Sequence, residues 1–277
     1  MSQQGPDEVI ALRLDDVGAC SKRYEVYSDR AWHLGPLTLP ANWLFLKYLP
    51  GLRAWGPYRE MEPSEWLMVY RLLADFRAKL TVAVTAAWPE DEHRLIPFPQ
   101  KFPQEAAVLK EGLQGGLLEI ANHGLTHCVL KDNAFKPRLF SSNRRFHREF
   151  GDWLPQEEQF EHLARSQGIL QDFFQTEIVT LVPPGNCFTE ETLTAASQVG
   201  LCYVSCQTPP RFSQDLVVLG DTRVFPCHDR DLVLGGVAWL RQRLETLAGR
   251  RFCFVKELGE MVQAGVLPLQ PPAGSQD

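Results

Sequence analysis

The stretch Leu12-Arg13-Leu14-Asp15-Asp16-Val17-Gly18 marks the strand around which the chain is organised. Apolar and β-branched residues lead into it from Val9, which is typical of a short buried strand, and two acids and a glycine end it. Two neighbouring carboxylates repel each other, so a cation between them is favoured where water is scarce. Because adjacent strand residues point to opposite faces, we expect one acid to bind a metal and the other to move a proton. A simple turn, in which aspartate is common, is the alternative.

The composition is that of a soluble globular protein. The 277 residues are 44% hydrophobic and 22% charged, which is enough for one large domain with a sizeable core. The net charge of −6 argues against nucleic acid as the main partner, and no apolar run is long enough to span a membrane. The polar first residues do not resemble a secretory signal, and seven cysteines, an odd number, are typical of reduced thiols. We therefore expect a cytoplasmic protein.

Strand-like and helix-like segments alternate along the chain. The strand-like runs are residues 9–14, 80–86, 117–121, 178–182, 201–205, 223–225 and 252–255. Amphipathic helical patterns between them predict a mainly parallel sheet with helices outside. No repeat or shift of composition divides the chain, so we predict one α/β domain over residues 1–277. Its expected architecture is a closed or nearly closed (β/α) barrel of about seven strands.

Two segments depart from this alternation. Residues 21–62 are rich in tryptophan and tyrosine and are broken by proline and glycine, which predicts an aromatic insertion. Its rings would either stack on sugars, cover a site, or fill the core of the insertion itself. From about residue 268 the chain is rich in proline, glycine and serine, which predicts a disordered tail.

Four polar clusters fall where predicted strands end. They are Asp15-Asp16, residues 123–127, residues 183–186 and His228-Asp229. In a (β/α) barrel the chemistry gathers at the C-terminal ends of the strands. The coincidence of four clusters at this edge is therefore stronger evidence for a site than any one of them.

His123 and His127 are four residues apart, which is a spacing that can hold a metal. If a helical turn follows the strand, both imidazoles project to one side and can share an ion. A strand-end aspartate completes a set of two histidines and one carboxylate, which leaves positions open for water and substrate, as catalytic zinc requires. In the alternative reading His123 caps a helix and His127 is an ordinary core residue.

These motifs resemble those of the polysaccharide deacetylases, the nodulation-type carbohydrate esterases, and the chain looks like a divergent member. Asp15-Asp16-Val17-Gly18 is similar to their Thr-Phe-Asp-Asp-Gly motif. Residues 123–127 match His-(Ser/Thr)-x-x-His in spacing, with Gly124 in place of the hydroxyl residue. Residues 182–185 resemble the third motif of the family, and residues 225–229 resemble its late Leu-x-x-His motif, both more loosely.

The resemblance implies a distorted (β/α)7-type barrel and metal-dependent removal of an N-acyl group from a sugar. Carried over residue by residue, it makes Asp16, His123 and His127 the metal ligands. It makes Asp15 the general base and His228 the general acid, for which a structural role is the alternative. A divalent ion, with Zn²⁺ as first choice, would activate water and stabilise the oxyanion, while His228 protonates the leaving amine.

Two departures concern the groups that support the base and the acid. The arginine of the third motif, which holds the base carboxylate in the family, is replaced by Leu181. Arg13 lies two residues before Asp15, so in a strand both side chains point to the same face, and Arg13 could take over that role. We find no counterpart of the Asp-Trp segment that supports the late histidine in the family.

Substrate contacts are expected from two places. Pro184 stands at the family's aromatic position and has no N–H to donate to an oxyanion, so Gly185 or another amide would have to serve. The basic stretch after His127, residues 131–148, could receive a phosphate or uronate group, or could be a solvated loop. The predicted substrate-binding residues are Pro184, Gly185, Asn186, Arg144 and Arg145.

The predicted substrate is an N-acylated sugar or glycan that carries negative charge. Acetyl is the default acyl group and formyl the second choice. The acceptor would be a nucleotide sugar or a growing surface glycan such as O-antigen. Two other functions stay open: a non-catalytic sugar-binding or regulatory protein on a decayed deacetylase scaffold, and a metal-dependent hydrolase of a non-sugar amide. The sequence does not determine the oligomeric state.

Overall fold

The structure is a computed structural model, and it describes residues 8–23, 31–40, 49, 51, 59–91, 93–128 and 148–269. The main sheet contains β1 (Val9–Val17), β4 (Leu80–Val84), β7 (Leu118–Asn122), β8 (Thr180–Leu181), β9 (Tyr203–Ser205), β10 (Arg211–Ser213), β11 (Leu216–Leu219), β12 (Val224–His228) and β13 (Arg251–Cys253). Two short hairpins are formed by β2 (Ala31–Leu34) with β3 (Leu37–Pro40), and by β5 (Ala87–Pro89) with β6 (Leu95–Pro97).

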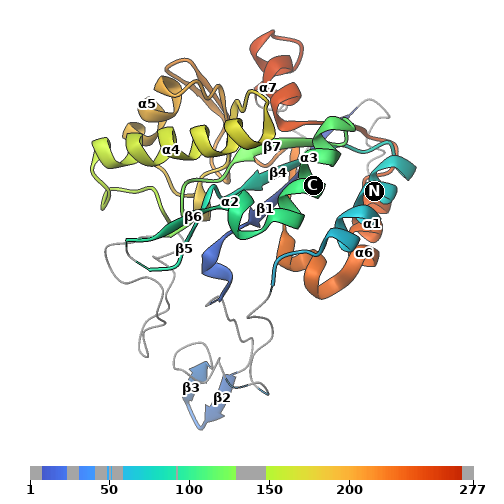
Figure 1. The fold of residues 1–277 in the computed structure, drawn as a ribbon. Coiled ribbons are helices and arrows are strands. Elements are labelled where there is room, and N and C mark those ends of the chain that lie inside the picture. The colour runs from blue at the N-terminus through green and yellow to red at the C-terminus, as the bar shows by residue number, and fades with distance from the viewer. Residues whose placement is uncertain are drawn as a thin grey trace.

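Helices surround this sheet (Figure 1). They are α1 (Pro63–Asp75), α2 (Phe98–Lys101), α3 (Pro103–Gln114), α4 (Gln156–Phe174), α5 (Glu190–Gln198), α6 (Asp229–Thr246) and α7 (Val255–Gln263), with the 3₁₀ turns η1 (Cys20–Arg23) and η5 (Pro184–Asn186). Among the described helices, none combines the length and the apolarity that a membrane crossing requires.

The strand order is that of a barrel that does not close. Around the sheet the order is β10-β11-β9-β8-β7-β4-β1-β12, so parallel neighbours follow chain order until β12 returns to the other side of β1. Within the described residues, β12 and β10 are not paired, and the sheet is a curled half-barrel. The predicted distorted (β/α)7-type barrel is confirmed, whereas closure by strand pairing is not seen. Apolar side chains of β11, β12 and α7 form one cluster that joins the two edges instead.

The first strand is central because it pairs on both sides. It bonds to β4 on one edge and to β12 and β13 on the other, and it is buried along its whole length. A parallel strand that is covered on both faces needs a continuous apolar run, which Val9 to Leu14 supplies except at Arg13. The polar residues that follow this run are therefore placed at the C-terminal edge of the sheet.

Several predicted segments lie partly outside the described residues. Of the aromatic insertion at 21–62, the structure describes the end of η1, the β2–β3 hairpin with Trp32, Leu34 and Leu37 exposed, and isolated residues before α1. Arg144 and Arg145 lie outside the described residues, as does the predicted tail beyond residue 269. The predictions for these segments stay predictions.

Candidate metal centre

Asp15 and Asp16 turn toward the same pocket. The pairing of β1 with β4 shifts register between Leu14 and Val17, and Asp16 has a left-handed backbone with φ 73°. Such a bulge re-aims a side chain that regular alternation would send to the opposite face. The expectation that the two acids point to opposite faces is therefore wrong, because both line one pocket.

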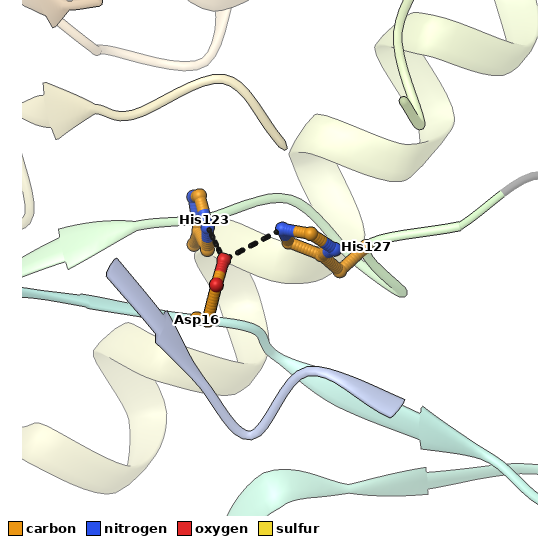
Figure 2. A group of neighbouring side chains, drawn as sticks. All are labelled: Asp16, His123 and His127. Atoms are coloured by element: carbon orange, nitrogen blue, oxygen red, sulfur yellow. Dashed lines mark hydrogen bonds and ion pairs between the residues drawn. The ribbon is translucent and has the colours of Figure 1, made fainter. Parts of the chain in front are cut away.

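Asp16 lies between the two imidazoles (Figure 2). Its Oδ1 is 3.3 Å from His123 Nε2 and 3.1 Å from His127 Nε2. All three side chains are buried, and their candidate ligand atoms lie within 4.8 Å of one another. Ligand atoms at about 2.0–2.1 Å from a tetrahedral zinc are about 3.3 Å apart, so the observed spacing fits such an ion. Apart from this 3.1 Å contact with Asp16, the buried Nε2 of His127 has no partner with hydrogen-bond geometry, which fits the role of a metal ligand.

Each imidazole is oriented by a contact at its other nitrogen. His123 Nδ1 is 2.6 Å from the carbonyl oxygen of Val182, and His127 Nδ1 is 3.2 Å from Ser21 Oγ. A carbonyl can only accept, so Nδ1 of His123 carries a proton, and Nε2 is the ring nitrogen that faces Asp16 and the candidate ion. The donor set and its orientation therefore fit a divalent metal.

The segment after β7 is not a helical turn, which is the condition under which the histidine spacing alone would bring both imidazoles to one side. Residues 125–128 form bends, and His127 has φ 56°. The imidazoles still converge, with ring centroids 4.7 Å apart. Part of the reason is Asn122, whose Oδ1 accepts a hydrogen bond of 2.9 Å from the Gly124 amide and so turns the chain at the strand end.

Arg13 holds the second carboxylate of the site. Its Nε and Nη2 donate to the two oxygens of Asp15 at 2.8 and 2.9 Å, and its Nη1 donates to Ser205 Oγ at 2.7 Å. Burial alone would lower the pKa of Arg13, but Asp15, with a smaller contribution from Asp221, raises that pKa. The arginine missing at Leu181 thus has a counterpart in Arg13, as the strand parity suggested.

His228 lies on the β12 side of the pocket and is about one third exposed. Burial would lower its pKa, but the negative charges of Asp16, Asp231 and Asp15 raise it to about 9. Asp231 Oδ2 accepts from the His228 amide at 2.9 Å and lies 3.6 Å from its Nδ1. Sequence reasoning missed Asp231, and the available signal was an acid three residues after the residue that caps α6.

The pKa of Asp16 is shifted in the opposite direction to that of His228. Burial would raise the pKa of Asp16, but the charge of His228 and the two imidazoles hold it well below its usual value. The site therefore contains an ionised carboxylate beside two imidazoles and opposite a protonated one. This is a place where a cation, a water molecule and a proton donor can meet.

These groups line a pocket of about 160 Å³ that is open to solvent. The lining residues are Asp15, Asp16, His123, His127, Pro183, Gly185, Asn186, His228 and Arg230. Of the predicted substrate contacts, Gly185 and Asn186 are exposed in this lining, whereas Pro184 is buried and Pro183 lines the pocket in its place. Sequence reasoning missed Arg230.

A family model described as polysaccharide deacetylase matches residues 57–204, which is more than half of the 277-residue chain. The matched segment contains His123, His127 and the η5 turn, and it leaves out Asp15, Asp16 and His228. No curated protein sequence shows significant similarity to the chain.

Solved structures resemble the chain at low sequence identity. A protein from Mycobacterium smegmatis assigned as a polysaccharide deacetylase is 13% identical, with a TM-score of 0.57 over 96% of this chain and 94% of that one. A family 4 acetyl xylan esterase from Clostridium thermocellum in complex with a cobalt ion is 13% identical, with a TM-score of 0.47 over 96% of both chains. A CE4 family pseudoenzyme from Bacillus anthracis is 12% identical, with a TM-score of 0.44 over 74% and 62%. At 13% identity, the similarity to the Mycobacterium smegmatis structure is evidence for a shared fold and not for a shared activity.

Proposed function

The chain belongs to the polysaccharide deacetylase family, and from this premise we propose that it is a metal-dependent hydrolase that removes an N-acyl group from a sugar. One observation carries the proposal: Asp16, His123 and His127 converge with metal-ligand spacing beside a second carboxylate, Asp15, that a separate residue holds. A divalent ion bound there would polarise the amide carbonyl and lower the pKa of a bound water.

The proposed division of labour follows from the contacts of each residue. Asp15 is the general base, because Arg13 fixes its orientation while each carboxylate oxygen keeps a further lone pair for a proton. His228 is the general acid, because it is protonated near neutral pH and lines the same pocket. The amide of Gly185, an exposed residue of the pocket lining, is the proposed donor to the developing oxyanion.

The proposal extends to the metal, the substrate and the compartment. Two imidazoles and one carboxylate favour Zn²⁺ among the common divalent ions. We propose acetyl as the acyl group, with formyl as the second choice, on a nucleotide sugar or a surface glycan such as O-antigen. Arg230 in the pocket lining supports a substrate with an anionic group. Seven free thiols, five of them buried, support a reducing compartment such as the cytoplasm.

The alternative, a sugar-binding protein on a decayed scaffold, was motivated by the missing arginine and the missing support for the late histidine. Arg13 beside Asp15 and Asp231 beside His228 supply groups of the same chemistry, which supports the hydrolase. A non-sugar amide as substrate stays a possible outcome of the assay.

The test is release of acetate or formate from a panel of N-acylated sugars by the Zn²⁺-loaded protein, with and without chelator. We expect metal-dependent release that Asp15→Asn slows by about 10²-fold or more. Asp172→Asn, which changes an exposed aspartate of α4, should leave the release unchanged. Binding of a sugar without release, equal in wild type and Asp15→Asn, would instead establish the sugar-binding alternative. Release of the acyl group from a simple N-acyl amide, without release from any sugar, would instead identify a non-sugar amide as the substrate.

A further inference from the structure

The loop that carries the third metal ligand has a backbone that needs outside support. Gly124 has φ 77° and His127 has φ 56°, and the left-handed region is unfavourable for a residue with a side chain. The ring of His127 must lie beside Asp16 if both are to bind the same ion. A contact that holds this backbone therefore also holds the metal site.

Glu149 makes that contact. Its Oε1 accepts a hydrogen bond from the amide of Leu125 at 3.0 Å, and its Oε2 accepts from the amides of Thr126 at 3.0 Å and His127 at 2.8 Å. The side chain is fully buried, although it is charged. Three successive backbone donors thus share one carboxylate, which fixes the loop more tightly than any single bond.

His162, from α4, supports the carboxylate from the other side. Its Nδ1 is 2.6 Å from Glu149 Oε1, and the ring is largely buried. A buried carboxylate costs folding energy unless charge and hydrogen bonds compensate it. His162 and the loop amides together supply that compensation, so the helix is tied through Glu149 to the loop of His127.

The Glu149 carboxylate also fills the space that a side chain at position 124 would need. A Cβ built on Gly124 would lie 2.3 Å from Glu149 Oε2 and 3.0 Å from Pro184 Cγ. The position of the Glu149 carboxylate therefore depends on the absence of a side chain at Gly124. A hydroxyl residue at position 124 would push the carboxylate away from the amides that it holds.

We infer that Glu149, supported by His162, is a positioning residue of the metal centre that acts through the backbone of His127. The inference rests on the metal site of the proposed function, and it adds a residue that touches neither the ion nor the substrate. Groups that stand behind metal ligands change metal affinity by about 10- to 100-fold when they are altered. Glu149 is placed to have an effect of that size.

The first experiment measures Co²⁺ binding to the full chain and the visible absorption spectrum of the bound ion. We expect Glu149→Gln to raise the Kd for Co²⁺ by about tenfold or more and to alter the spectrum, because the amide donates where a carboxylate oxygen accepted. Glu157→Gln, which removes an exposed carboxylate of α4, is the matched control and leaves both unchanged. Thermal unfolding of the metal-free proteins shows that each variant is folded.

Two further variants cover the case in which Glu149→Gln does not fold. Gly124→Ser displaces the carboxylate, and His162→Gln removes its partner while the three amides keep theirs. We expect both to raise the Kd for Co²⁺, with the smaller increase for His162→Gln. A wild-type Kd and spectrum in every folded variant would overturn the inference.

The readout separates this inference from the proposed reaction. If the wild type binds Co²⁺ but releases no acyl group, the hydrolase proposal fails while the role of Glu149 is still measured by the Kd. If acyl release is observed and Glu149→Gln binds Co²⁺ like the wild type, only the positioning role fails. A wild type that binds no Co²⁺ overturns both.

Discussion

The two ends of the sheet bury carboxylates in contrasting surroundings. At the N-terminal end of β7, Glu119 accepts from Thr81 Oγ1 at 2.6 Å, from Thr180 Oγ1 at 2.5 Å and from the Lys256 amide at 3.2 Å. At the C-terminal end, Asp15 and Asp16 face a guanidinium and imidazoles and border a pocket. Both groups of carboxylates are almost completely buried.

The pKa directions separate the two ends. Burial raises the pKa of Glu119, and its hydroxyl and amide donors only partly oppose it. At Asp16 the charge of His228 and the imidazoles overcome burial and lower the pKa well below its usual value. A buried carboxylate is therefore no sign of a site by itself. Partners that keep it ionised, together with a neighbouring pocket of about 160 Å³ compared with about 10 Å³ beside Glu119, distinguish the candidate site from a structural contact.

The largest effect is expected on metal affinity, when the charged ligand Asp16 at the C-terminal edge of the sheet is neutralised. Asp16→Asn replaces a charged ligand with a weak neutral one, so the loss of metal affinity should exceed the ~100-fold typical of residues behind a ligand. Metal content after dialysis and acyl release both measure it. Glu119→Gln, the corresponding change at the other end, should retain full metal content, and equal metal loss in both variants would remove the distinction between the ends.

Asp15→Asn should separate proton transfer from metal binding. We expect kcat to fall by about 10²- to 10⁴-fold, the usual range for loss of a general base, while bound metal is retained. The measurement is the rate of acyl release at matched metal occupancy. A fall in metal content that accounts for the whole loss of rate would make Asp15 part of the ligand set instead.

The titration of His228 tests the electrostatic coupling across the pocket. In the metal-free protein its NMR midpoint should lie near pH 9, compared with its ordinary value of 6.5. Because the folded-state pKa is raised, its contribution to stability is complete below pH 6.5 and is lost as the pH rises through about 9. Asp231→Asn and Zn²⁺ should each lower the midpoint, since one removes a negative charge and the other adds positive charge near Asp16. An unchanged midpoint with Zn²⁺ would place the ion elsewhere.

Glu119→Gln should produce the smallest effect, confined to stability. Because its pKa is raised above the ordinary 4.5 in the folded state, the wild type loses stability relative to the variant as the pH rises above 4.5. The Tm difference between the two proteins at pH 4 and pH 8 measures this, and acyl release should be unchanged. A wild type that gains stability over the variant as the pH rises would show that Glu119 is held ionised.

The sequence determined the architecture and the residues worth testing. Alternating apolar strands and amphipathic helices predicted the (β/α)7-type barrel, because a parallel sheet covered on both faces demands continuous apolar runs. The chain order of Asp15-Asp16, His123, His127 and His228 at strand ends placed them at one edge. That inference needs only the rule that parallel strands end together, so it does not depend on detailed packing.

The tertiary structure alone decided how these side chains are aimed and what holds them. Strand parity could not show that a bulge turns Asp16 into the pocket, because the backbone there depends on register with a neighbouring strand. Glu149 lies more than twenty residues from the loop that it supports, and its role follows only from the packing of α4 against that loop. The periodicity of a sequence indicates which residues share a face of one helix or strand. It does not indicate contacts between segments far apart in the chain, such as those of the buried Glu149 carboxylate.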